Sequence, residues 1–144
     1  MLRRLLVTLM LTLLLSAPAT AQTSWQLELC LGETDGSNDE VIESCTEVLN
    51  NRRTAKKDRV VAYYRRGAQY YEKSYYDLAI LDYSKIIELD PAAADAYRNR
   101  SAAYRDKGDL DRASADYTKA IAAYAKAIAQ AEKSLNKPTK RRQK

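Results

Sequence analysis

The chain has 144 residues, with 24 basic and 19 acidic side chains, two cysteines and no histidine. The absence of histidine excludes imidazole general-base catalysis and metal sites built on histidine. The formal net charge of +5 is mild, and much of the basic excess lies at the two ends of the chain.

The first 21 residues have the layout of a secretory signal peptide. Arg3 and Arg4 form a positive start, Leu5 to Leu15 is an almost unbroken apolar run, and residues 19–21 supply small side chains for cleavage. The run is about half of the roughly 20 residues that cross a bilayer, which disfavours a transmembrane anchor. Its strength favours general secretion over the twin-arginine route. We therefore expect removal of residues 1–21 and export to the periplasm, where nucleic acid is not an expected partner.

Residues 22–50 predict a divergent helical hairpin. Trp25 opens it, residues 32–38 are rich in turn formers, and a capping box of Ser37 and Glu40 begins the second helix. Apolar side chains recur with helical spacing at Val41, Ile42, Cys45, Val48 and Leu49. Residues 51–59 then form a polar connection whose basic side chains are expected to be solvated.

Cys30 and Cys45 are the two cysteines of this hairpin. An even number of cysteines in an oxidising compartment favours a disulfide, which would join the two helices. The alternative is a pair of free or redox-active thiols. No Cys-x-x-Cys spacing is present to lower a thiol pKa, so the disulfide is favoured.

Residues 60–93 and 94–127 repeat each other. Such a period marks a solenoid, in which each unit buries its apolar face by stacking on a neighbour. We therefore predict an all-α fold, a short α-solenoid of antiparallel helical hairpins with a long C-terminal helix. Identical positions include Ala62/Ala96, Tyr63/Tyr97, Arg66/Arg100, Tyr70/Tyr104, Ala79/Ala113, Asp82/Asp116, Tyr83/Tyr117 and Ile87/Ile121.

Three helix starts are expected from capping residues. Ser74 can cap the second helix of the first repeat, with Asp77 returning a bond to the backbone. Asp90 and Pro91 are expected to end the first hairpin and begin the next, and Asp109 to cap the last helix.

The repeated pattern resembles the tetratricopeptide repeat. Its first copy reads Tyr63-x2-Arg66-Gly67-x2-Tyr70 and Ala79-x3-Tyr83, followed by Pro91. The second reads Tyr97-x2-Arg100-Ser101-x2-Tyr104 and Ala113-x3-Tyr117, with Ser101 in place of glycine and Ala125 in place of a closing proline. The resemblance implies a scaffold that holds other proteins, with Gly67, Ser101, Ala79 and Ala113 at the closest helix approaches.

The same resemblance implies where a partner would bind. In such proteins the first helix of each hairpin faces a concave groove that accepts a peptide. Only Asn99 falls on a position used by the chaperone-tail clamp of one subfamily, so that specificity is not expected. The implied groove residues are Tyr64, Arg65, Tyr71, Glu72, Arg98, Asn99, Arg105 and Asp106.

The last hairpin helix is expected to continue from about Asp109 to Leu135, with 128–136 as an extension beyond the repeats. Apolar residues spaced by 4 and 3 form a seam on one face, which includes Tyr124, Ile128, Ala131 and Leu135. Either the helix folds over the last repeat as a cap, or the seam is open for a second copy or a partner. Residues 137–144 are expected to be a disordered basic tail or a tether to an anionic surface.

No catalytic constellation accompanies these repeats. The sequence has no Gly-x-Ser-x-Gly elbow and no phosphate-binding glycine loop. The repeated carboxylates are expected on solvent-facing helix positions; they are Asp77, Asp111, Asp82 and Asp116. We therefore expect a protein that is not an enzyme, needs no cofactor or metal, does not span a membrane, and binds a protein or peptide partner or forms a homodimer.

Overall fold

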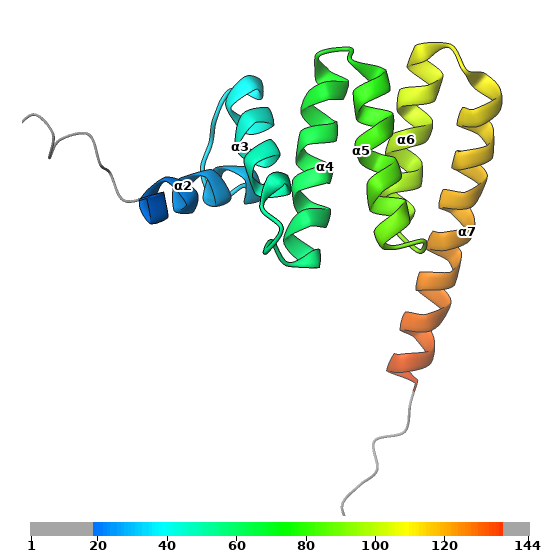
Figure 1. Cartoon of the computed structure of the whole chain (residues 1–144). Coiled ribbons are helices and arrows are strands. Elements are labelled where there is room, and N and C mark those ends of the chain that lie inside the picture. The colour runs from blue at the N-terminus through cyan, green and yellow to red at the C-terminus, as the bar shows by residue number, and fades with distance from the viewer. Residues whose placement is uncertain (1–18, 137–144) are drawn as a thin grey trace, which may run out of the picture. The chain divides into compact units, whose positions relative to one another are not determined.

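The computed structural model describes residues 19–136, and every element in this range is a helix (Figure 1). The helices are α2 (Ala19–Leu31), α3 (Asn38–Asn50), α4 (Lys56–Glu72), α5 (Tyr76–Leu89), α6 (Ala94–Lys107) and α7 (Leu110–Leu135). The predicted all-α hairpin fold is confirmed. None of these helices is both long and apolar enough to cross a membrane. Of the expected signal peptide only residues 19–21 are described, and the expected basic tail lies outside the described residues.

The chain divides into two compact units, an N-terminal unit that ends at Arg65 and a C-terminal unit that begins at Arg66. In the N-terminal unit, α2 packs against α3, and Cys30 and Cys45 lie at disulfide-bonding distance with their Cα atoms 4.8 Å apart. The predicted cysteine pair is therefore confirmed. The buried core around it consists of Leu29, Cys30, Val41, Cys45, Val48, Leu49 and Ala62.

The start of α3 follows the sequence prediction. Ser37 is the N-cap, its backbone N–H donates to Glu40 Oε2 at 2.8 Å, and the Glu40 N–H donates to Ser37 Oγ at 3.4 Å. The hydrogen bond from the Ser37 backbone holds the pKa of Glu40 below its ordinary value. After α3 the connection is shorter than expected, because α4 already begins at Lys56.

In the C-terminal unit, the end of α4 pairs with α5, and α6 pairs with α7. Gly67 lies at the closest approach of the first pair, where an added Cβ would be 3.1 Å from Tyr83 Cε1. Ser101 takes the same position in the second pair and uses its hydroxyl to donate to the Ala113 carbonyl at 2.7 Å. The serine that departs from the repeat pattern therefore ties α6 to α7.

The prediction that Asp82 and Asp116 face solvent is wrong. Both are buried, and each accepts two hydrogen bonds from an arginine on the first helix of its own repeat. Arg66 Nε and Nη2 donate to Asp82 at 2.9 and 2.8 Å, and Arg100 donates to Asp116 through the same atoms. Burial raises the pKa of Asp82, and the Arg66 guanidinium opposes that rise. A helical periodicity cannot show that such a charge has a partner on the neighbouring helix.

Two predicted helix starts are also wrong. Ser74 has a positive φ of 61° and caps nothing, while α5 begins after Tyr75 without a side-chain cap. Asp90 ends α5, as expected, but it does not cap α6, because its Oδ1 accepts from the Ala92 N–H at 2.9 Å in the turn before that helix. Only the third prediction is confirmed, because the Asp109 side chain accepts from the Arg112 N–H and begins α7.

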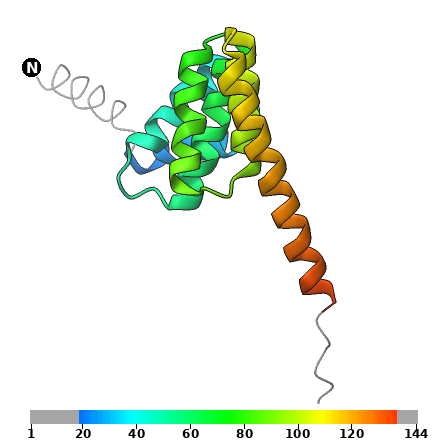
Figure 2. The ribbon, with the colours of Figure 1, turned by 90° about the vertical axis from the view of Figure 1, so that its right-hand side faces the viewer.

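The last helix, α7, is continuous over 26 residues, as the sequence predicted. It packs against α6 through Ala113, Asp116 and Ala120 and then runs past the ends of α5 and α6 (Figures 1 and 2). The alternative in which it folds back over the last repeat is therefore wrong.

Candidate functional site

Three of the expected groove residues come together between α4 and α6. The Tyr71 hydroxyl donates to Asp106 Oδ2, and Arg105 Nε donates to Asp106 Oδ1 at 2.8 Å. The bond to the Asp106 carboxylate raises the pKa of Tyr71, and the guanidinium of Arg105 lowers the pKa of Asp106. The cluster is therefore a charged, hydrogen-bonded link between the first helices of the two repeats, and we call it the Tyr71 cluster.

The exposed face of α6 continues from this cluster toward the start of the helix. Arg98 lies one turn after Asp95 and forms an ion pair with it at 3.4 Å. The Tyr124 hydroxyl of α7 donates to the same Asp95 carboxylate. Arg98 and Arg105 lie seven residues apart on one helix face, and their side chains are 54% and 63% exposed. Asn99, the residue after Arg98, is half-buried.

The remaining groove residues have different surroundings. Glu72 is exposed at the end of α4. Tyr64 and Arg65 belong to the N-terminal unit and are half-buried there. Arg65 lies against Gly32, which has a φ of +86° and where any side chain would overlap the guanidinium. Its Nε is buried without a hydrogen-bond partner among the described residues. Arg65 therefore lies against the turn after α2 and not on an open face.

The expected seam of α7 is open in the described structure. Tyr124 is half-buried, whereas Ile128, Ala131 and Leu135 are exposed. The exposure is clearest at Tyr117, which is 57% exposed, whereas Tyr83 at the equivalent position of the first repeat is 2% exposed.

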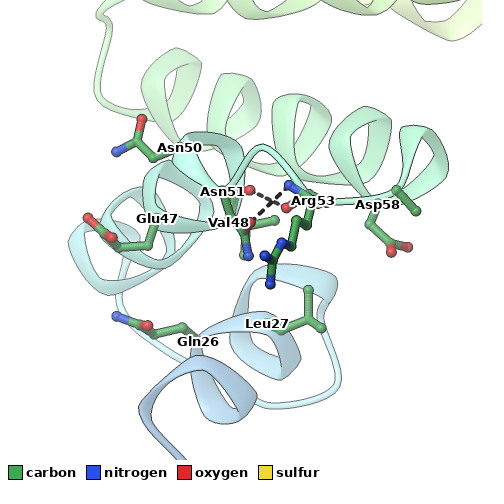
Figure 3. Close-up of a pocket in the computed structure, with 10 residues that line it drawn as sticks. Gln26, Leu27, Glu47, Val48, Asn50, Asn51, Arg53 and Asp58 are labelled. Carbon is green, nitrogen blue, oxygen red and sulfur yellow. Dashed lines mark hydrogen bonds between the residues drawn. The ribbon is translucent and has the colours of Figure 1, made fainter. Parts of the chain in front are cut away.

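A hollow of about 790 Å³ in the N-terminal unit was not expected from the sequence. It lies between α2 and the connection from α3 to α4, with Leu27 and Val48 among its apolar lining residues (Figure 3). The Arg53 backbone N–H donates to Asn51 Oδ1 at 2.9 Å, and the Thr54 hydroxyl donates to the Val48 carbonyl at 2.6 Å. These polar groups of the lining are therefore already used to hold the connection between α3 and α4 in place. Helical periodicity in the sequence could not predict this hollow, because the non-helical connection between α3 and α4 forms one of its walls.

No group of three or more potential metal-ligating side chains is gathered anywhere in residues 19–136. The features that stand out are therefore surfaces: the α6 face with the Tyr71 cluster, and the open stripe of α7.

The paired helices and their small contact residues define an all-helical fold of the tetratricopeptide-like, helical-repeat type. Neither a protein-family model nor a curated protein sequence matches the chain. Among solved structures, the crystal structure of MamA protein is similar, with a TM-score of 0.54 and 24% sequence identity. The similarity covers 71% of this chain and 50% of that one, so the chain spans half the length of MamA. It shows the fold alone.

Proposed function

We propose that the C-terminal unit binds a peptide segment of an envelope or secreted protein on the face of α6 that carries Arg98, Asn99 and Arg105. The observation that carries the proposal is the pair of exposed arginines, each oriented by a neighbouring aspartate. A guanidinium has five N–H donors, so each arginine keeps free donors after pairing with its aspartate. Holding the side chains beforehand also reduces the rotamer entropy lost on binding.

The chemistry of this face favours a polar peptide of mixed charge. Arg98 and Arg105 are balanced by Asp95 and Asp106 on the same helix, so the face has no strong net charge. Recognition would therefore rest on directed hydrogen bonds to peptide carbonyl and carboxylate oxygens and on stacking, for which arginine and tyrosine are suited. Tyr71, next to Arg105, adds an aromatic surface beside those donors.

We also propose that the protein is exported to the periplasm and that it is not an enzyme. The leader-like residues 1–21 and the paired cysteines Cys30 and Cys45 support an exported protein in the oxidising periplasm. The absence of histidine and of nucleophile motifs supports a binding protein without a cofactor.

Site-specific photo-crosslinking tests the binding face even while the partner is unidentified. A benzophenone side chain is placed at Arg98, at Arg105, or at Leu81, which is exposed on α5, a helix that carries no residue of the proposed face. We expect the same partner peptide to crosslink from positions 98 and 105 and not from 81. Equal yield at all three positions, or crosslinks from 81 alone, would contradict the proposed face.

Once the partner is identified, affinity measurements give a second test. Replacing both Arg98 and Arg105 by Ala should weaken binding by about 2 kcal/mol or more, the size of a hot-spot loss. Lys85→Ala on α5 is the control, because Lys85 pairs with its neighbour Glu88 in an exposed contact. An Arg98→Ala/Arg105→Ala protein that binds as tightly as the control would move the site elsewhere.

A further inference from the structure

Five large apolar side chains form one exposed stripe along α7. Leu110, Tyr117, Ile121, Ile128 and Leu135 are between 54% and 83% exposed. Their spacing of 7, 4, 7 and 7 residues places them within a narrow sector of the helix at 100° per residue. The stripe therefore follows the heptad pattern of a helix that packs against another helix.

The repeat itself shows what kind of element covers this stripe. Tyr83 of α5 is equivalent to Tyr117 of α7, and α6 packs against α5 beside it, with Arg100 donating to Ser84 at 2.8 Å. No described residue takes the place of α6 next to α7. The missing element is therefore a helix.

A second copy cannot supply this helix through the start of its α4. The face of α4 equivalent to the packed face of α6 contains Ala62 and Tyr63. In the N-terminal unit, Ala62 is fully buried in the core formed by α2 and α3, and Tyr63 packs against that core. Head-to-tail stacking of copies through this face is therefore blocked, and a two-fold pairing of like surfaces remains.

The stripe is complementary to itself when two α7 helices are aligned antiparallel over their full length. Leu110 then lies opposite Leu135 of the second copy, Tyr117 opposite Ile128, and Ile121 opposite Tyr124. The four basic residues Arg112, Lys119, Lys126 and Lys133 recur every seven residues on the side of α7 away from the stripe, so no basic side chain enters this apolar contact.

We infer that the protein forms a two-fold symmetric dimer by antiparallel pairing of α7 with α7 of a second copy. A helix of 26 residues is about 39 Å long and about 10 Å wide, so the stripe offers roughly 400 Å² per copy. The two copies together would bury roughly 800 Å², which is less than the about 1,200–2,000 Å² of stable complexes and predicts a weak, transient dimer. The inference does not depend on the partner-binding face of α6.

Sedimentation of the processed protein from low micromolar to submillimolar concentration tests the dimer. We expect the mass to rise with concentration and to level off at twice that of the monomer. A protein that stays monomeric, or whose mass continues to rise beyond the dimer, would overturn the inference. Ile128→Glu should weaken the dimer at least about a hundredfold, because it places a charge in the apolar contact. Ala129→Glu is the matched control, exposed on the same helix but off the stripe, and should behave as wild type.

A charge exchange tests the antiparallel register. Ile128→Glu mixed with Tyr117→Lys should regain the dimer, because residue 128 lies opposite residue 117 of the other copy and the two new charges attract. Ile128→Glu mixed with Ile121→Lys should not, because position 121 faces Tyr124. Circular dichroism of each variant checks that the monomer is folded. A dimer that survives Ile128→Glu, or equal rescue by both lysine variants, contradicts the proposed pairing.

Discussion

Arg100 and Asp116 form a buried, bidentate ion pair that joins the two helices of the second repeat, with N–O distances of 2.6 and 3.0 Å. The Arg100 guanidinium also lies near the rings of Tyr97 and Tyr104, at 5.7 and 5.9 Å from their centroids. The hydrogen bond to Asp116 raises the pKa of Arg100 above its ordinary value. The pair in the first repeat, Arg66 with Asp82, has the same geometry.

Removing one partner of this pair should be far more damaging than removing both. Arg100→Met leaves the buried Asp116 carboxylate without its two hydrogen bonds, with only Lys119 Nζ nearby at 3.9 Å, and we expect a loss of about 3 kcal/mol in the free energy of unfolding. Arg100→Met/Asp116→Leu should recover much of it. Denaturant unfolding of both variants measures this. Lys85→Met, which breaks an exposed pair, should cost about 0–1 kcal/mol; a similar cost for Arg100→Met would mean that the buried pair is not needed.

Gly67→Leu should destabilise the C-terminal unit, because its side chain would enter the contact with Tyr83. We expect a cost of about 1–3 kcal/mol or more from overpacking, which outweighs the roughly 1 kcal/mol that replacing a helical glycine can gain. Thermal unfolding checks the prediction, with Ala122→Leu on the exposed side of α7 as the control. An unchanged melting temperature for Gly67→Leu would show that the two helices do not approach closely at this residue.

Loss of the cysteine pair should destabilise the N-terminal unit. The bridge closes a loop of 15 residues, and the chain-entropy relation values such a loop at about 3 kcal/mol. Cys30→Ala/Cys45→Ala should therefore unfold at lower denaturant concentration. Thiol titration of the denatured, unreduced wild type gives an independent reading, and two reactive thiols per chain would rule out the bond.

Acid should weaken the cap of α3. The pKa of Glu40 is lowered in the folded state by its bonds to Ser37, so ionised Glu40 favours folding above its ordinary pKa of 4.5. That contribution is lost as the pH falls below 4.5 and through the lower folded-state value. The difference in melting temperature between wild type and Glu40→Gln should therefore shrink as the pH is lowered across this range. A difference that is constant from pH 7 into acid would contradict the assignment.

The sequence predicts the features of this fold that depend on periodicity. The internal repeat locates the paired helices, Ser37 with Glu40 marks the start of α3, and the uninterrupted run to Leu135 predicts the length of α7. What it cannot predict are contacts between helices. Asp82 and Asp116 look solvent-facing until Arg66 and Arg100 are placed beside them, and Arg65 looks like a groove residue until Gly32 is found against it. The turn chemistry at Ser74 and Asp90 fails for a similar reason, since packing sets where α5 and α6 begin.

The exposed C-terminal end of α7 should also be the first part of the C-terminal unit to unfold. Every residue from 125 to 136 is exposed, so this half of the helix depends on its own alanine-rich sequence, and isolated helices of such length are marginal in water. In the monomer, its amides should exchange with solvent at little free-energy cost, whereas those near the buried Ala113 and Ala120 should require opening of the whole unit. Unfolding of the C-terminal unit should therefore begin as fraying at Leu135 and stop at Tyr124, where the first contact with α6 is made through Asp95.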